Sequence, residues 1–532
     1  MVIIPDSKVK LIKNPLKLDS NNEITFSSKT AQYNYFNSLP KLEFDNLTYI
    51  RKEGVLRIET NDNLTFEDLL QYNFCMYQNT HFDTKWFYAF ITDIKWINPS
   101  LTEISLETAY YQTWQFDLVY MDSFIEREHV NDDTIGLHTL PEDLELGDPI
   151  QTMNPYNFSI FTEHWICIGM TEIPPAFQHI NTNRIYNGIY SGLTYMVFKT
   201  STDASNWILA CDEAGRGEAI DSMFMIPKEL CPNSSFIQGT MGSYSFEFTW
   251  IENSNSEITL ASLIQVTRPV TLAYTYTPKN NKLYTFPYSY MTLTNNAGTD
   301  VVLRYEDFRD RNVNFKVIGS ISAGCSIKCI PLNYKRAYDG TNTTYSFNFG
   351  VNAGKFPICS WNSDVYTNWL TQQGANISIS HLTNELGIIG NGITGNWSGV
   401  ASNVKNITGI MLEKYEHSFT PNQAKGNTNS GDVTFSSGNL KFTIYYMSIR
   451  KEYAESIDSY FKMFGYKVNR LGKPHIKART YYDYIKTIGI NLEGNIPEND
   501  LIEIRKMFDN GIRFWHSTQY YLDFSVNNTI VS

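Results

Sequence analysis

The chain has 532 residues and a formal net charge of −12 at pH 7, with 42% hydrophobic and 18% charged residues. This length exceeds what one hydrophobic core usually serves and predicts several domains, while the composition excludes a largely disordered chain. The acidic excess disfavours a protein that grips nucleic acid through its phosphates. Aromatic residues make up 14% of the chain, with 35 Tyr and 32 Phe, which favours pleated sheet.

Short strand-like runs fill the first 125 residues. Residues 55–60 (VLRIET) and 102–107 (TEISLE) alternate apolar and polar side chains, and residues 86–94 form a longer apolar run. These patterns predict antiparallel strands, with a turn at Asn98-Pro99-Ser100.

Residues 126–148 change character because eight acidic residues accompany a single arginine, Arg127. The acidic residues are Glu126, Glu128, Asp132, Asp133, Glu142, Asp143, Glu145 and Asp148. This composition predicts an exposed connection that leaves the first domain.

Two further β-rich regions are predicted from 150 to 265 and from 266 to 360. Their strand-like runs are residues 165–170, 243–251, 284–293 and 313–321. Near the carboxyl end, residues 441–449 predict a strand. Residues 449–464 and 498–510 carry apolar side chains at helical spacing.

One glycine-rich stretch fits none of these β regions. Residues 386–404 contain no formal charge, and six glycines fall between 387 and 411. Large apolar residues recur every three or four positions at Leu382, Leu386, Ile389, Ile393, Trp397, Val400, Val404, Ile407 and Met411. On a helix they would form one continuous apolar stripe.

Glycine weakens a helix in water, whereas a membrane enforces helix because unpaired backbone groups are costly there. Gly395 and Gly399 have the spacing that lets neighbouring helices approach closely. The pattern therefore predicts a membrane-active segment, and it fits equally well a loop that packs on its own subunit. The residues expected to meet lipid are Leu386, Ile388, Ile389, Ile393, Trp397, Val400, Val404, Ile407, Ile410 and Met411.

No motif of a known catalytic or cofactor site occurs in the chain, so we expect no enzyme activity and no cofactor. Glu126 and Glu128 could share one face of a strand as a glycosidase pair does, but an exposed acidic stretch explains them better. His129 and His516 have no companion at metal-ligand spacing. The seven cysteines are odd in number and scattered, which predicts reduced thiols.

Residues 441–479 contain nine Lys or Arg against three acids, with tyrosines between them. Such a region binds either nucleic acid or an acidic neighbour. We favour a subunit interface, for example with residues 126–148 of an adjacent copy.

Several blocks of residues resemble, in the same order, the tail-knob proteins of Picovirinae- or Salasmaviridae-type podoviruses. Near the amino end they are QYNYFN (32–37), QN (78–79), KWFYAF (85–90), QTWQFD (112–117) and SFIEREHV (123–130). Near the other end they are FGYKVNR (464–470), FDNGI (508–512) and WH (515–516). Residues 359–370 and 420–432 match around the glycine-rich stretch.

This resemblance implies a mainly-β, multidomain fold with barrel-like antiparallel sheets and a few helices near the carboxyl end. It implies a homo-hexameric tube at the distal end of the virion tail, made in the bacterial host cytoplasm, through which genomic DNA passes without specific binding. Expected partners are a lower collar or proximal tail protein, a tail-tip cell-wall-degrading protein and the host cytoplasmic membrane. Residues 373–430 would plug the tube and then engage that membrane.

The domain division that we expect has five parts. They are a tube domain (1–125), a distal knob domain (126–265), a further β-rich domain (266–372), the plug loop (373–430) and a carboxyl-terminal α+β region (431–532). The first and last parts should pack together. Two alternatives are a tail adhesin that binds cell-wall glycan through aromatic clefts and a wall hydrolase that uses paired carboxylates.

Overall fold

The computed structural model describes most of the chain outside the 361–440 region. The described residues are 6–48, 51, 54–79, 84–158, 163–177, 180, 183–231, 233, 235–255, 258–296, 298–308, 313–321, 325–335, 349–352, 358–360, 425–427 and 441–531. They form two compact units. Unit 1 comprises residues 1–145, 278–282 and 452–532, and unit 2 comprises 146–277 and 283–451.

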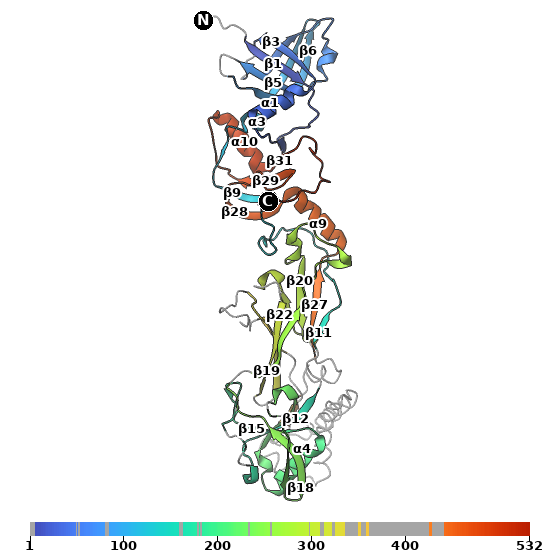
Figure 1. Cartoon of the computed structure of the whole chain (residues 1–532), viewed down its shortest axis with the longest axis vertical. Helices are drawn as coiled ribbons and strands as arrows, with labels where there is room; N and C mark the ends of the chain where they lie inside the picture. The colour runs from blue at the N-terminus through green and yellow to red at the C-terminus, as the bar shows by residue number, and fades with distance from the viewer. Residues whose placement is uncertain are drawn as a thin grey trace, which may run out of the picture. The chain divides into compact units, whose positions relative to one another are not determined.

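Unit 1 is built around two sheets (Figure 1), the first antiparallel and the second mixed, because β2 pairs parallel with β31. The first sheet has the order β3-β1-β5-β6-β7-β4. Its strands are β1 (Ser7–Ile12), β3 (Lys41–Leu47), β4 (Val55–Glu59), β5 (Phe74–Asn79), β6 (Phe87–Asn98) and β7 (Leu101–Thr108). The predicted turn joins β6 to β7, where the Asn98 side chain accepts a hydrogen bond from the Ser100 backbone N–H at 2.9 Å.

The second sheet of unit 1 joins the two ends of the chain, in the order β2-β31-β29-β9-β28. Its strands are β2 (Asn22–Ile24), β9 (Ser123–Glu128), β28 (Tyr466–Gly472), β29 (Tyr482–Ile488) and β31 (Ile512–Trp515). A small ribbon pairs β8 (Val119–Tyr120) with β30 (Leu492–Glu493). Because β2 pairs with β31 and β9 with both β28 and β29, the expectation that the two ends pack together is confirmed.

Helices complete the core of unit 1. They are α1 (Lys29–Ser38), α2 (Phe66–Leu69), α3 (Tyr110–Trp114), α9 (Lys451–Phe464) and α10 (Glu498–Asn510). In α10 the buried Leu501, Ile504 and Phe508 recur at helical spacing, and Gly511 ends the helix with a φ of 95°. The sequence predicted α9 and α10. It did not predict α1, which begins at the N-cap Ser28.

Unit 2 contains three larger sheets around one extended hydrophobic core. A seven-stranded sheet has the order β17-β18-β15-β12-β16-β25-β26. Its strands are β12 (His164–Met170), β15 (Thr194–Phe198), β16 (Ile220–Pro227), β17 (Ile237–Met241), β18 (Tyr244–Trp250), β25 (Ile358–Ser360) and β26 (Lys425–Asn427). Helix α4 (Ser201–Glu213) packs on this sheet through the fully buried Trp207, which contacts Phe246 and Phe248.

The other two sheets of unit 2 carry the remaining predicted strands. The four-stranded sheet contains β19 (Ile258–Val266), β22 (Val313–Ile321), β23 (Cys325–Pro331) and β24 (Val351–Asn352). The five-stranded sheet contains β10 (Ile150–Gln151), β11 (Tyr156–Phe158), β20 (Ser289–Thr294), β21 (Asp300–Leu303) and β27 (Phe442–Ser448). A two-residue hairpin pairs β13 (Ile185–Tyr186) with β14 (Ile189–Tyr190).

Short 3₁₀ turns connect several of these strands. They are η2 (Pro175–Phe177), η3 (Gly217–Ala219), η4 (Lys228–Leu230), η5 (Ala273–Thr275), η6 (Asn281–Tyr284) and η7 (Tyr305–Asp307). The predicted mainly-β, multidomain fold is therefore present, with α1, α2, α3 and α4 added to the helices that the sequence indicated.

Candidate assembly surface and its charge network

Three large apolar side chains form an exposed row across the second sheet of unit 1. Leu471 of β28 pairs in register with Phe124 of β9, and Phe124 pairs in register with Ile488 of β29. Their side chains are 77%, 39% and 59% exposed, respectively. We call these three residues the apolar row.

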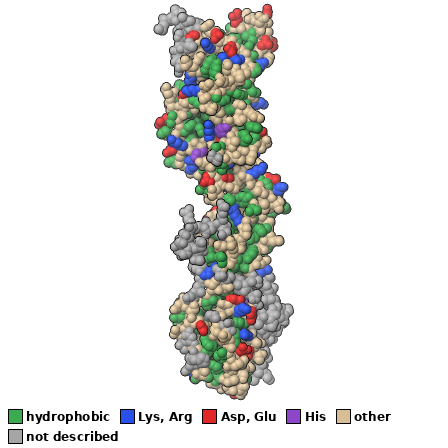
Figure 2. Space-filling view, in the orientation of Figure 1, with side chains coloured by type: hydrophobic (Ala, Val, Ile, Leu, Met, Phe, Trp, Pro, Cys, Tyr) green, Lys and Arg blue, Asp and Glu red, His purple; other side chains and the backbone are tan. Residues whose placement is uncertain are grey.

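The opposite face of β9 and β29 is buried, which fixes the direction in which the row points. Ile125 follows Phe124 and is fully buried, and its register partner Thr487 is 1% exposed. Successive side chains of a strand point to opposite faces, so Phe124 lies on the face of β9 opposite to Ile125. Beside the row, the Glu126 carboxylate and the Lys486 ammonium are 2.9 Å apart. Hydrophobic side chains lie among charged ones on the surface of the molecule (Figure 2).

A buried carboxylate, Glu128, ties β28 to β9. Its oxygens accept hydrogen bonds from Arg470 Nε at 2.5 Å and from the His475 backbone N–H at 3.1 Å. Burial alone would raise the pKa of Glu128, but His475 and Arg470 together outweigh burial and lower that pKa. Glu128 is therefore an ionised structural anchor.

A second buried carboxylate, Glu142, joins three segments of unit 1. Its side chain is fully buried and forms ion pairs with Arg127 and with Lys282, whose own side chain is 1% exposed. The Lys467 backbone N–H donates to the same carboxylate at 2.9 Å. Burial lowers the pKa of Lys282, and the charge of Glu142 opposes that shift.

These contacts correct one prediction. Residues 126–148 do not form a wholly exposed connection, because Arg127, Glu128, His129 and Glu142 are all buried. The acidic and basic regions meet within one chain, where β9 pairs with β28, and a contact of residues 441–479 with another copy stays a prediction. Composition suggested exposure because an acidic run is usually solvated, whereas here distant cations neutralise the buried carboxylates.

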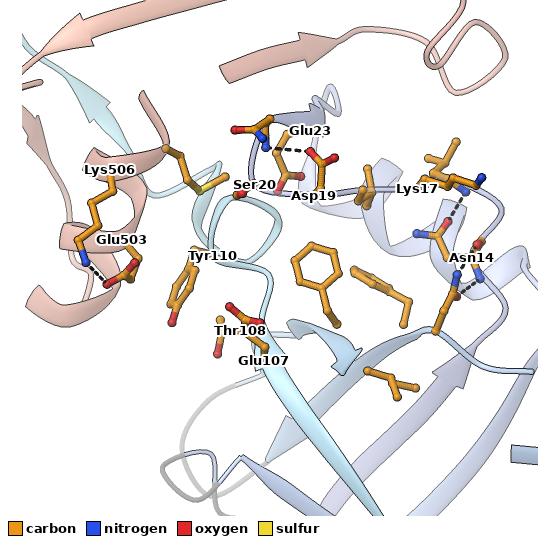
Figure 3. Close-up of a pocket in the computed structure, with 18 of the residues that line it drawn as sticks. Asn14, Lys17, Asp19, Ser20, Glu23, Glu107, Thr108, Tyr110, Glu503 and Lys506 are labelled. Atoms are coloured by element: carbon orange, nitrogen blue, oxygen red, sulfur yellow. Dashed lines mark hydrogen bonds and ion pairs between the residues drawn. The ribbon is translucent and has the colours of Figure 1, made fainter. Parts of the chain in front are cut away.

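A cavity of about 580 Å³ lies in unit 1 between the first sheet, the 14–23 segment and α10 (Figure 3). Glu107, Thr108 and Tyr110 line it on one side, and the Glu503–Lys506 ion pair of α10 lines another. Glu23 of β2 also lines it and is 1% exposed. Burial raises the pKa of Glu23 to about 8, while a hydrogen bond from Gln112 Nε2 at 2.7 Å opposes the shift.

The residues weighed for catalysis have structural roles. Glu126 pairs with Lys486 and Glu128 with Arg470, so each carboxylate is held by its own cation. His129 is buried with a pKa lowered to about 3, mainly by burial, and its ring nitrogens bond the Lys462 carbonyl and the Tyr484 N–H. His516 Nε2 lies 2.8 Å from Asp483.

The cysteines that the structure describes are buried free thiols: Cys75, Cys167, Cys211, Cys231, Cys325 and Cys329. Within the described part of the chain, no group of three or more His, Cys, Asp or Glu side chains is arranged to hold a metal ion. The apolar row was missed from sequence. The pair Phe124-Ile125 places one apolar side chain on each face of the strand, but the sequence does not tell which of the two faces is covered.

The ten residues expected to meet lipid, from Leu386 to Met411, lie outside the described residues. The described chain resumes at β26, which pairs antiparallel with β25. The two strands are neighbours at one end of the seven-stranded sheet. None of the helices in the described ranges is long and apolar enough to span a membrane.

Comparisons with known proteins agree with the fold. A family model for the N-terminus of the caudoviral major tail protein matches residues 5–119, and one for the C-terminal domain of the Bacillus phage phi29 tail knob protein gp9 matches residues 248–529. The first match defines a structural tail protein of a phage virion. The second match spans more than half of the chain. The chain therefore belongs to the tail knob protein family of short-tailed phages.

Relatives match over nearly the whole length. Tail knob protein gp9 of Bacillus phage B103 is 25% identical over 99% of both chains, and that of phage phi29 is 24% identical over 97% of both. The solved structure of the bacteriophage C1 tail knob protein, gp12, has the same fold, with a TM-score of 0.62 and 16% identity over 99% of this chain and 100% of that one. The resemblance seen in the sequence is thus confirmed.

Proposed function

We propose that six copies of the chain assemble through unit 1 into a ring that forms the distal tail tube and conducts the genome. The single observation that carries this proposal is the apolar row, three large side chains exposed side by side on a sheet face. Contiguous exposed apolar surface of this kind marks interaction sites in soluble proteins. A ring requires heterologous contacts, so the row would meet a different surface of the next copy.

Replacement of Leu471 and Ile488 by Ser tests the ring. We expect the double variant to dissociate into smaller species at concentrations at which the native chain is hexameric, as measured by size-exclusion chromatography with light scattering. Leu70→Ser is the matched control, because Leu70 is 55% exposed on unit 1 but lies outside the row. A native chain that stays monomeric, or equal dissociation of both variants, would contradict the proposal.

We further propose that residues 373–430 plug the tube and then engage the host cytoplasmic membrane. The support is the glycine-rich apolar stripe in the sequence, together with the pairing of β25 and β26, the described strands that precede and follow this stripe along the chain.

Dye release from liposomes tests this role. The full chain should cause pH-dependent leakage, and a chain that lacks residues 386–411 should cause none. The matched control replaces residues 386–411 with a Gly/Ser linker of equal length, which separates loss of the stripe from shortening of the loop. Equal leakage from all three proteins would argue against a membrane role.

The remaining partners follow from the same assembly. The ring would contact a lower collar or proximal tail protein on one side and a tail-tip cell-wall-degrading protein on the other, after synthesis in the host cytoplasm. We propose a structural role without catalysis. An acidic lumen would let DNA pass without adhesion, as the net charge of −12 permits. A cryo-electron microscopy map with a basic lumen in contact with phosphates would refute that last point.

A further inference from the structure

A second cavity of about 580 Å³ lies in unit 1 on the side of α9. Four segments line it: the 129–133 stretch after β9, the 279–281 insertion, α9 and the carboxyl-terminal stretch 525–530. Arg479, which precedes β29, completes the wall. The carboxyl-terminal stretch is held there by backbone hydrogen bonds, from Thr480 to Thr529 at 3.0 Å and from Val531 to Ala478 at 2.9 Å.

Three cationic side chains line this cavity: Lys279, Lys462 and Arg479. Among the described residues none of the three side chains has a hydrogen-bond or ion-pair partner, and Arg479 Nε is a buried donor without an acceptor. Burial lowers the pKa of Lys462, and the nearby charge of Lys279 lowers it further. Carboxylates lie near all the same: the charges of Asp523 and Asp458 oppose the lowering of the Lys462 pKa, and Asp133 and Asp483 interact electrostatically with Arg479.

The acidic groups around the cavity are already engaged. Asp133, the one carboxylate in its lining, accepts hydrogen bonds from the Asn281 N–H at 3.0 Å and the Tyr466 hydroxyl at 2.7 Å, and burial raises its pKa. Asp458 accepts the backbone N–H groups of Lys279 and Asn280. Asp523 accepts from Ser525. The one histidine of the lining, His129, is neutral because burial lowers its pKa to about 3.

We infer that this cavity binds a phosphate-type oxyanion, held by Lys279, Lys462 and Arg479. The guanidinium offers a donor fork that suits tetrahedral oxyanions, and the two ammonium groups add point charges. A cavity of this volume is in the range of small-molecule sites, so either free phosphate or the phosphate of a small monoester fits. A bound anion would cross-link α9, the 279–281 insertion and the carboxyl-terminal stretch, and would stabilise unit 1.

Binding is tested on the full chain by isothermal titration calorimetry, with thermal unfolding as a second readout. The probes are inorganic phosphate, glycerol 2-phosphate and succinate, each compared with sodium chloride at matched ionic strength. We expect phosphate or the monoester to bind and to raise the unfolding temperature, and succinate to do neither. If the monoester binds more tightly than phosphate, the natural ligand is an ester, and the reverse order points to the free anion.

Variants assign the effect to the cavity. Arg479→Gln and Lys462→Gln should each weaken phosphate binding by about tenfold or more, because a charge-assisted hydrogen bond is lost. Lys477→Gln is the matched control, because it removes the same charge from an exposed position two residues from Arg479. The structural contact of Lys462 is made by its backbone carbonyl, which bonds His129 Nε2, so Lys462→Gln leaves that contact in place. No binding by the native chain, an equal response to succinate, or an equal loss in Lys477→Gln would overturn the inference.

Discussion

The buried Glu23 carboxyl predicts a measurable pH dependence of stability. Glu23 lies on β2, which pairs with β31 and so joins the two ends of the chain. Burial is the main cause that raises its pKa from 4.5 to about 8, and the charge of Asp19 adds to the shift. The folded protein therefore keeps Glu23 protonated at pH values where the unfolded chain is ionised.

The sign and size of the effect follow from that difference. A group whose pKa is raised on folding contributes stability that is full below its unfolded pKa and is lost as the pH rises through the folded pKa. Each pH unit in this window costs about 1.4 kcal/mol, so between pH 4.5 and pH 7 the native chain should lose about 3 kcal/mol through Glu23. Glu23→Gln resembles the protonated form and should escape this loss.

The assay compares the native chain with Glu23→Gln by thermal unfolding at pH 5 and pH 7.5. Hydrogen exchange of β2 and β31 peptides reports on unit 1 itself, because a chain with two units need not unfold in one step. We expect near-equal stability at pH 5 and a clear advantage of the variant at pH 7.5. Glu107→Gln is the control, because Glu107 lines the same cavity but is exposed. A stability difference that is the same at both pH values would refute the reasoning.

Three further predictions concern the charge network and the turns beside it. Glu142→Gln should cost about 3–5 kcal/mol in urea unfolding, because it leaves the buried Lys282 ammonium without its counter-ion; a loss below 1 kcal/mol would contradict this. Gly465→Ala should destabilise the protein more than Gly489→Ala. Both glycines have a φ of +65°, so backbone strain alone costs each variant about 1–2 kcal/mol. Only at Gly465 would the added Cβ also clash with the Glu128 backbone. Because the pKa of Glu128 is lowered on folding, its contribution is present above the unfolded pKa and lost as the pH falls through the folded pKa. Glu128→Gln should therefore flatten the acid limb of the stability curve, and an unchanged acid limb would show that this carboxylate does not contribute.

Local sequence patterns predicted much of the secondary structure. The alternation of residues 313–321 predicted β22, in which every second side chain is buried, and the spacing of residues 498–510 predicted α10 with matching bounds. Helix α4 was missed because the aromatic composition around it favoured strands, although Thr200 caps it by accepting a hydrogen bond from the Asp203 N–H. The expected strand at 284–293 begins only at Ser289.

The five-part domain division and the lipid-facing residues stay predictions. The structure groups the chain into two units, and it brings residues 278–282 into unit 1, away from their neighbours in sequence. No periodicity marks that insertion. It is fixed by long-range contacts, such as the two hydrogen bonds that Asp458 accepts from the Lys279 and Asn280 backbone.

The sequence by itself determined the β-rich class, the carboxyl-terminal helices and the family, because these depend on short-range periodicity and on ordered blocks of residues. Only the tertiary structure decided which charges are buried. Glu142 meets Lys282 from 140 positions away, and Lys279, Lys462 and Arg479 converge on one cavity. The sequence does not distinguish a buried carboxylate or ammonium from an exposed one. The pKa and the role of each group depend on partners that the folded chain brings from distant segments.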